Sequence, residues 1–281
     1  MARGDRWTCK ITMQTRYLIP LIAAALVGCQ SLQRGPVEDL PEVPAQSLFD
    51  KVRFASNGSD NMTIESVASD VNQATLNAIG DLKTATKDRE GPSWDWADFS
   101  GVSIVENNRW QDKKTATLIS PDFVIMAKHF RRSVGDTIKW KTQDGAIVAR
   151  TLGSVRLCPF ADLALGRLDK PVTGLAIYQV LPPGYNWETA LRWSLSIHTD
   201  QEGKALIKRI HQATSSIVYL TPPPGFEALH ENLVSGDSGN PFFAYYGSQL
   251  VLLGVHWTTS SANFISDTGV VAWIQETAPT M

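Results

Sequence analysis

Short apolar runs separated by turn residues dominate the chain from about residue 97 onward. Turn signals such as Gln143-Asp144-Gly145 separate the runs, a pattern typical of strands joined by tight turns. The predicted strands are residues 101–105, 115–120, 123–127, 137–142, 146–152, 162–168, 174–180, 189–197, 204–220, 242–257 and 269–274. Many short strands with few helices predict an all-β fold, and about 185 residues are enough for two small barrels in tandem.

A helical period precedes this β-rich region. Its apolar positions within residues 62–83 are Ile64, Val67, Val71, Ala78 and Leu82. This spacing predicts an amphipathic helix that packs on the domain that follows. Residues 30–50 hold three prolines among Glu, Asp and Gln, a composition that favours an extended tether.

The N-terminal segment has the pattern of an export signal. Residues 17–28 are apolar but too few to span a bilayer, and four basic residues precede them. The run ends in Leu26-Val27-Gly28-Cys29, which resembles the lipobox of bacterial lipoproteins, whose cysteine is lipidated and becomes the new N-terminus. By the same resemblance, the absence of Asp at position 30 favours the outer membrane. The other interpretation is a buried apolar strand with an incidental cysteine.

The chain is therefore expected to comprise a lipoprotein signal peptide at 1–28, a tether with a helical segment at 29–96, and a β-domain at 97–281. The formal net charge is −2. Removing the leader leaves 22 Lys and Arg against 27 Asp and Glu. An acidic mature protein argues against a nucleic-acid partner, whereas a lipidated Cys29 implies a membrane surface.

Cysteine and histidine usage narrows the chemistry further. The three cysteines, Cys9, Cys29 and Cys158, cannot make a disulfide framework, and no CxxC pair indicates a zinc site. Of the five histidines, those at positions 198, 211 and 230 lack metal-ligand spacing. We therefore expect neither a metal nor a cofactor.

Three segments carry residues suited to nucleophilic catalysis. In Ser235-Gly236-Asp237-Ser238-Gly239-Asn240-Pro241, two glycines permit a tight turn that exposes the Ser238 hydroxyl. The N–H groups of Gly236 and Ser238 can then converge as an oxyanion hole. His129 follows a strand–turn–strand pattern, where it can serve as a base near neutral pH. Asp162 opens an apolar strand, where a carboxylate can orient a histidine.

Each segment alone also fits a simpler interpretation: a polar surface loop, a surface histidine or a strand-capping aspartate. Together they closely resemble the trypsin-like (chymotrypsin-fold) serine proteases over about residues 97–275. Residues 118–129 resemble the family's LISPxxVLTAAH region, residues 162–165 its DIALL segment, and residues 236–241 its GDSGGP motif. The order His, Asp, Ser is also that of the family, whereas unrelated folds with the same triad use other orders.

The resemblance implies a fold and a set of roles. The fold is two antiparallel six-stranded barrels, with His129 and Asp162 on the first, Ser238 on the second, and a polypeptide substrate in the cleft between them. Ser238 is the nucleophile, His129 the general acid and base, and Asp162 the residue that orients it. Gly236 and Ser238 supply the oxyanion hole.

The same resemblance marks a specificity pocket at Asn232, Trp257, Thr258 and Gly269. Trp257 matches the family's Ser-Trp-Gly strand, and Gly269 a later Gly-Val-Tyr segment. Asn232 is uncharged where trypsins carry the aspartate that selects Lys and Arg, and Thr258 replaces a glycine. A small or medium uncharged residue is therefore expected before the scissile bond.

Some features depart from the family. Phe130 follows His129, so the disulfide usual at that place is absent. No Ile-Val-Gly-Gly activation site is found, and Asp237 has no evident ammonium partner. The leading hypothesis is a lipid-anchored serine endopeptidase of the bacterial envelope. The alternative, motivated by His256, Thr258 and Asn240, is a catalytically silent protease-fold lipoprotein that binds peptides or acts as a scaffold. The oligomeric state and the role of residues 51–96 stay open.

Overall fold

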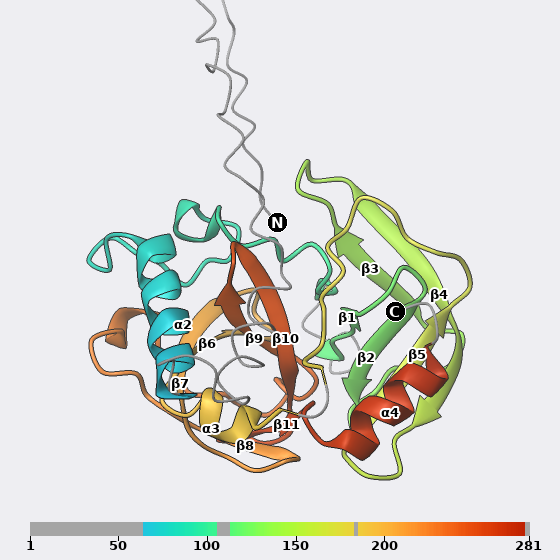
Figure 1. Cartoon of the computed structure of the whole chain (residues 1–281). Helices are drawn as coiled ribbons and strands as arrows, with labels where there is room; N and C mark the ends of the chain where they lie inside the picture. Colours follow the sequence, from blue (N-terminus) through green and yellow to red (C-terminus); the bar gives the residue numbers. More distant parts are fainter. Residues whose placement is uncertain (1–63, 106–112, 183–184, 279–281) are drawn as a thin grey trace, which may run out of the picture. The chain divides into compact units, whose positions relative to one another are not determined.

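Two antiparallel β-sheets form the framework of the described chain (Figure 1). The computed structural model describes residues 64–105, 113–182 and 185–278, all within the unit Val43–Met281. The expected leader, the tether before residue 64 and the candidate lipidation site Cys29 lie outside the described residues. None of the described helices is both long and apolar enough to cross a bilayer.

The first sheet is curled and has five strands. They are β1 (Thr117–Leu118), β2 (Phe123–Ala127), β3 (Thr137–Lys141), β4 (Ile147–Leu157) and β5 (Leu163–Leu168), in the order β1-β2-β5-β4-β3. The sheet is not closed, so the expectation of a six-stranded first barrel is corrected.

The segment predicted as a strand over residues 101–105 lies between the two edge strands but joins neither in a ladder. Val102 forms an isolated bridge with Thr117, and the Ile104 N–H donates to the Lys139 carbonyl at 2.9 Å. The Val102 N–H is engaged in a local turn with the Phe99 carbonyl at 2.9 Å. The Val102 N–H is therefore not available to pair with β3, although the Ser103 and Leu118 N–H groups bond across the bridge to β1.

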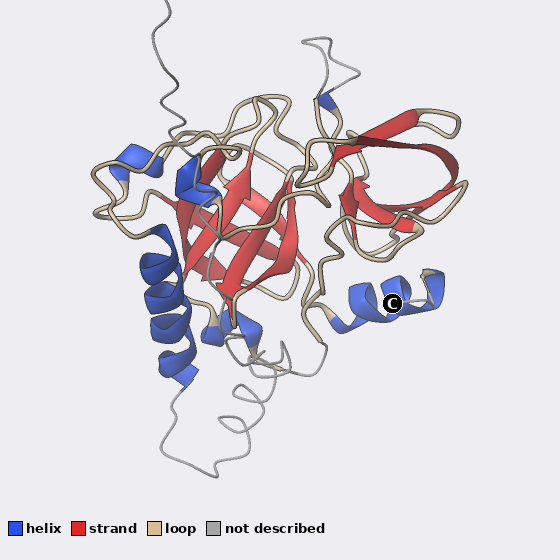
Figure 2. Cartoon of the chain, turned by 90° about the horizontal axis from the view of Figure 1, so that it is seen from above, coloured by secondary structure: helices blue, strands red, loops and turns tan. Residues whose placement is uncertain are grey.

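The second sheet is a closed barrel in the order β10-β11-β8-β7-β6-β9. Its strands are β6 (Leu195–Thr199), β7 (Ala205–Ala213), β8 (Ile217–Thr221), β9 (Pro241–Tyr246), β10 (Gln249–His256) and β11 (Ser261–Phe264). The helices are α2 (Ile64–Ile79), α3 (Trp187–Ala190) and α4 (Thr268–Thr277), with short 3₁₀ helices η1 (Pro92–Trp94) and η3 (Glu227–Leu229). Figure 2 shows α2 beside the barrel and α4 beside the curled sheet.

Two further strand predictions were wrong, and the one over residues 189–197 holds only from Leu195, because α3 ends at Ala190. Residues 269–274 lie in α4, because the Asp267 carboxylate caps the helix by accepting the N–H groups of Gly269 and Val270 at 2.8 and 3.1 Å. Residues 174–180 form only an isolated bridge, between Val180 and Leu252. In that segment the buried Tyr178 instead packs its ring against Phe243, with centroids 4.7 Å apart.

The central strands are buried on both faces, which explains their continuous apolar runs. In β2, Phe123 and Ile125 pack in the layer between the two sheets, whereas Val124 and Met126 fill the curl of the first sheet. In β10, Leu252 faces the same middle layer and Leu253 faces the interior of the barrel. The strands that lead to the candidate site residues are therefore held by packing from two sides.

Helix α2 packs on the barrel through the apolar face that the sequence pattern predicts. Val67 and Val71 are buried in the cluster that fills the barrel. Asn72 also binds the backbone at the start of β6: its Oδ1 accepts the Leu195 N–H at 2.6 Å, and its Nδ2 donates to the Trp193 carbonyl at 3.3 Å. Both apolar and polar contacts thus fix the helix against the domain.

Candidate active site

The ends of two neighbouring strands bring His129 and Asp162 together. Ala127 at the end of β2 pairs with Leu163 at the start of β5. Just beyond, the Lys128 N–H donates to the Asp162 carbonyl, and the His129 N–H donates to Asp162 Oδ1, each at 3.0 Å. Asp162 Oδ2 hydrogen-bonds to His129 Nδ1. A carboxylate at this nitrogen holds the imidazole in the tautomer that leaves Nε2 free to act as a base.

Ser238 lies in the turn that precedes β9 and faces this histidine. Its Oγ is 3.0 Å from His129 Nε2, although 109 positions separate the two residues. The side chain of His129 is 45% exposed and that of Asp162 is 19% exposed. The hydroxyl end of the chain of hydrogen bonds therefore opens to solvent while the carboxylate end is shielded. Such an arrangement can transfer the hydroxyl proton to the imidazole as the oxygen attacks a carbonyl carbon.

The turn around Ser238 requires glycine at Gly236. Its φ is +107°, and a Cβ there would lie 2.2 Å from Oε1 of the buried Gln201. Within the described part of the chain, the backbone N–H groups of Gly236 and Ser238 have no hydrogen-bond acceptor. Free donors beside a nucleophile are what stabilisation of an oxyanion needs.

Two buried asparagines tie the site together, and the sequence analysis gave neither of them a positioning role. Asn240 Oδ1 accepts the hydroxyls of Thr115 and Thr199 at 3.1 and 3.2 Å, so it links the segment before β1 to the barrel. Asn263 Nδ2 donates to the Asp162 carbonyl at 3.2 Å. The sequence holds a signal for both: Asn240 stands where the GDSGGP motif has its third glycine, and Asn263 interrupts an apolar strand.

The residues predicted to form the specificity pocket are not all brought together. Asn232 is exposed, and Trp257 is 41% exposed. The Thr258 hydroxyl closes the turn between β10 and β11 by bonding Ser261 Oγ at 2.7 Å. The roles of these three residues stay predictions.

Gly269 lies in the first turn of α4 rather than in a strand beside Trp257. The strand that pairs with β10 next to Trp257 is β11, where the Trp257 N–H donates to the Ser261 carbonyl at 3.2 Å. Gly269 is therefore not in a strand, and its place in a specificity pocket stays a prediction, like those of the other three residues.

Two buried histidines lie in the barrel wall that adjoins the nucleophile turn. The His256 carbonyl accepts the Gly239 N–H at 3.0 Å, and His256 Nε2 is 2.9 Å from His198 Nδ1. Burial lowers the pKa of both imidazoles, and that of His256 falls to about 3. Both rings are consequently neutral at pH 7.

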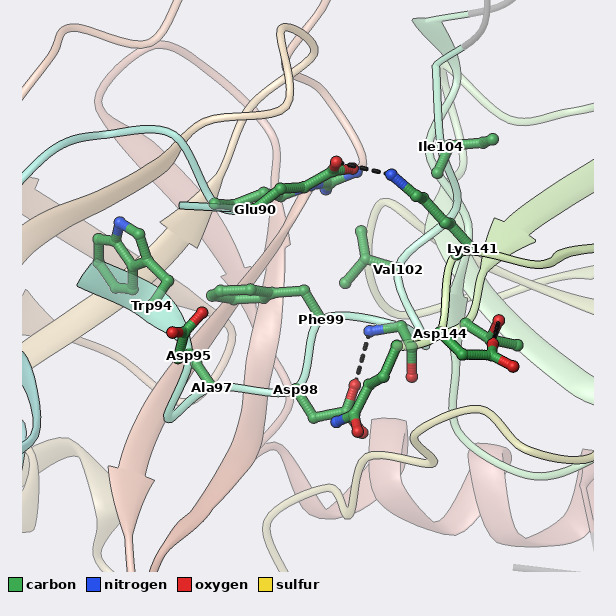
Figure 3. Close-up of a pocket in the computed structure, with 15 residues that line it drawn as sticks. Glu90, Trp94, Asp95, Ala97, Asp98, Phe99, Val102, Ile104, Lys141 and Asp144 are labelled. Atoms are coloured by element: carbon green, nitrogen blue, oxygen red, sulfur yellow. Dashed lines mark hydrogen bonds and ion pairs between the residues drawn. The ribbon is translucent and has the colours of Figure 1, made fainter. Parts of the chain in front are cut away.

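A cavity of about 530 Å³ lies apart from the triad (Figure 3). It lies between the segment around residues 89–104 and the turn after β3, and the Glu90 carboxylate pairs with Lys141 Nζ across it at 2.7 Å. None of the three triad residues lines it. Among the described residues, no cluster of three or more His, Cys, Asp or Glu could hold a metal ion.

No protein-family model matches this sequence, and no curated protein is similar to it. The architecture alone, a closed six-stranded barrel beside a curled half-barrel, is compatible with a chymotrypsin-like fold.

Proposed function

We propose that this protein is a serine endopeptidase with Ser238 as nucleophile. The observation that carries the proposal is the continuous chain from Ser238 Oγ to His129 Nε2, at 3.0 Å, and from His129 Nδ1 to the Asp162 carboxylate. His129 takes the hydroxyl proton as Ser238 attacks the scissile carbonyl, and returns it to the leaving amine. The N–H groups of Gly236 and Ser238 bind the oxyanion, and water activated by His129 hydrolyses the acyl-enzyme.

Active-site labelling tests this proposal. A fluorophosphonate probe should label the full chain in mild detergent but not the Ser238→Ala variant, and only the full chain should cleave a casein substrate. The thermal transition of both proteins provides the folding control. If the folded parent stays unlabelled, the silent peptide-binding or scaffold lipoprotein becomes the better account.

We also propose that a lipid on Cys29 anchors the protein to the bacterial envelope, facing the periplasm or the cell surface. The proposal rests on the basic, apolar and small-residue order of residues 1–29. Replacing Cys29 with Ala should move the protein from the membrane fraction to the soluble fraction. Membrane association of the Cys29→Ala variant at the level of the parent would contradict the anchor.

A further inference from the structure

A buried lysine lies on β7, in the barrel wall that supports the nucleophile turn. Lys208 is 4% exposed, and its Nζ donates to the Glu231 carbonyl at 2.6 Å. Glu231 belongs to the segment that leads into the nucleophile turn. Its carboxylate lies near the surface and binds Lys204 Nζ at 3.0 Å and Lys87 Nζ at 3.1 Å. Of these three lysines, Lys208 is the buried one, and it binds the backbone of Glu231 rather than its carboxylate.

Asp237, the residue before the nucleophile, is a buried acid that shapes the same turn. It is 3% exposed. Its Oδ2 accepts the Val234 N–H at 2.6 Å, and its Oδ1 accepts the Gln201 N–H at 3.1 Å. These two bonds close the turn on itself and fasten it to the loop after β6. A buried carboxylate is costly unless hydrogen bonds and a nearby positive charge compensate it.

We infer that Lys208 is a positioning residue for Ser238: its buried ammonium fixes the Glu231 backbone and offsets the charge of the buried Asp237 carboxylate, so that the oxyanion turn stays formed. The expected effect of Lys208 on catalysis rests on the proposed function. The expected effect of Lys208 on the conformation of the turn does not. Burial lowers the pKa of Lys208 and raises the pKa of Asp237, and the charge of each group opposes the shift of the other. The positive charge is built into the barrel and requires no cleavage of the chain.

The charge on Lys208 can be varied by pH without changing its packing. Burial lowers the pKa of Lys208 to about 8, while Asp237 and Glu231 oppose that shift. Above this pH the neutral amine still donates to Glu231, but the positive charge is gone. A role limited to packing or to the hydrogen bond would therefore be indifferent to pH, whereas the inferred role is not.

The other ionisable groups that face Lys208 do not change charge in the same range. They are His198 on β6, His256 on β10, His230 and Glu231 in the segment after η3, and Asp237. Burial lowers the pKa of the three histidines, and Lys208 lowers it further, so they are neutral above pH 7. Lys204 and Lys87 lower the pKa of Glu231, whereas burial raises the pKa of Asp237 and Lys208 opposes that rise. Between pH 7 and 9.5, Lys208 is therefore the member of this group that titrates first.

The experiment compares the full chain with Lys208→Met and with the matched control Lys204→Met, all in mild detergent. Lys204 also binds Glu231, but at its carboxylate near the surface. Hydrogen exchange of a peptide covering residues 231–238 is measured at pH 7 and 9.5 and corrected for the intrinsic exchange rate. The fluorophosphonate labelling rate is measured over the same pH range.

In the parent and in Lys204→Met, protection of the turn and the labelling rate should both fall about tenfold as pH rises through 8. Lys208→Met should be poorly protected and about tenfold slower at pH 7, without the alkaline decline. Turn protection in the parent that is equal at both pH values would overturn the inference, even if Lys208→Met does not fold. If the exchange results hold but the parent is never labelled, the proposed function fails and the positioning of the turn stands.

Discussion

The two halves of the candidate site are held in different ways. His129 and Asp162 project from adjacent strand ends of the curled sheet, where the Lys128 N–H donates to the Asp162 carbonyl and the His129 N–H donates to the Asp162 carboxylate. Ser238 lies in a turn of the barrel half that is held both by backbone hydrogen bonds and by the buried side chains of Asp237 and Asn240. The acid–base pair is therefore secured at the ends of paired strands, whereas the nucleophile turn depends in addition on buried polar side chains.

The largest effect on the labelling rate is expected in the half of the site that holds His129 and Asp162. Asp162→Asn should lower the fluorophosphonate labelling rate roughly 10⁴-fold, because an amide favours the wrong tautomer of the imidazole. The free energy of unfolding should change little, since the backbone contacts of residue 162 remain. A labelling rate within tenfold of the parent would contradict the role of Asp162. Asp169→Asn, at the end of β5 on the same sheet, is the control.

The barrel half should show the strongest dependence of stability on pH. The folded pKa of His256 is about 3 and its ordinary value is 6.5, so the unfolded chain binds more protons between these values. Stability should therefore fall as pH drops from 6.5 to 3, by about 5 kcal/mol for this residue. Urea unfolding at pH 4 and 7 should show a smaller loss in His256→Gln than in the parent. The exposed His211→Gln should match the parent, and equal losses in all three proteins would contradict the assignment.

The nucleophile turn itself can be broken without touching the triad. Gly236→Ala places a methyl group 2.2 Å from Gln201 Oε1 at a φ of +107°, so the turn must move. Labelling should slow roughly 100- to 1,000-fold, as expected when an oxyanion donor is lost. Gly225→Ala is the matched control, because its φ is also positive and nothing lies within 4 Å of the added Cβ. Similar labelling of both variants would mean that the turn is not constrained at Gly236.

The smallest expected effect concerns the link between the two halves. Asn240→Ala removes the acceptor of the Thr115 and Thr199 hydroxyls and should cost about 2 kcal/mol of stability. Labelling should slow as well, because Asn240 also donates to the Asp237 carbonyl at 3.2 Å. Urea unfolding and labelling are compared with Asn77→Ala on the exposed face of α2. A stability loss no greater than that of Asn77→Ala would show that this link is dispensable.

The same contrast explains what the sequence could predict. The strands that carry His129 and Asp162 were foreseen at nearly their observed limits, because strands buried on both faces leave continuous apolar runs. The helix over residues 64–79 also follows from its periodicity. Edge pairing was not foreseen: residues 101–105 bond to both edge strands only at isolated points and complete no barrel. The polar supports of the site were not foreseen either, because Gln201, which binds Asp237, and Asn263, which binds Asp162, lie in segments far from the motif.

The spacing of the site residues along the chain has a consequence for biogenesis. Asp162 meets Asn263 across 101 positions, and His129 meets Ser238 across 109. A chain that emerges from its N-terminus cannot assemble these contacts until the last barrel strand, ending at Phe264, has been synthesised. The hydrogen-bonded array of Ser238, His129 and Asp162 is therefore absent from every shorter nascent chain.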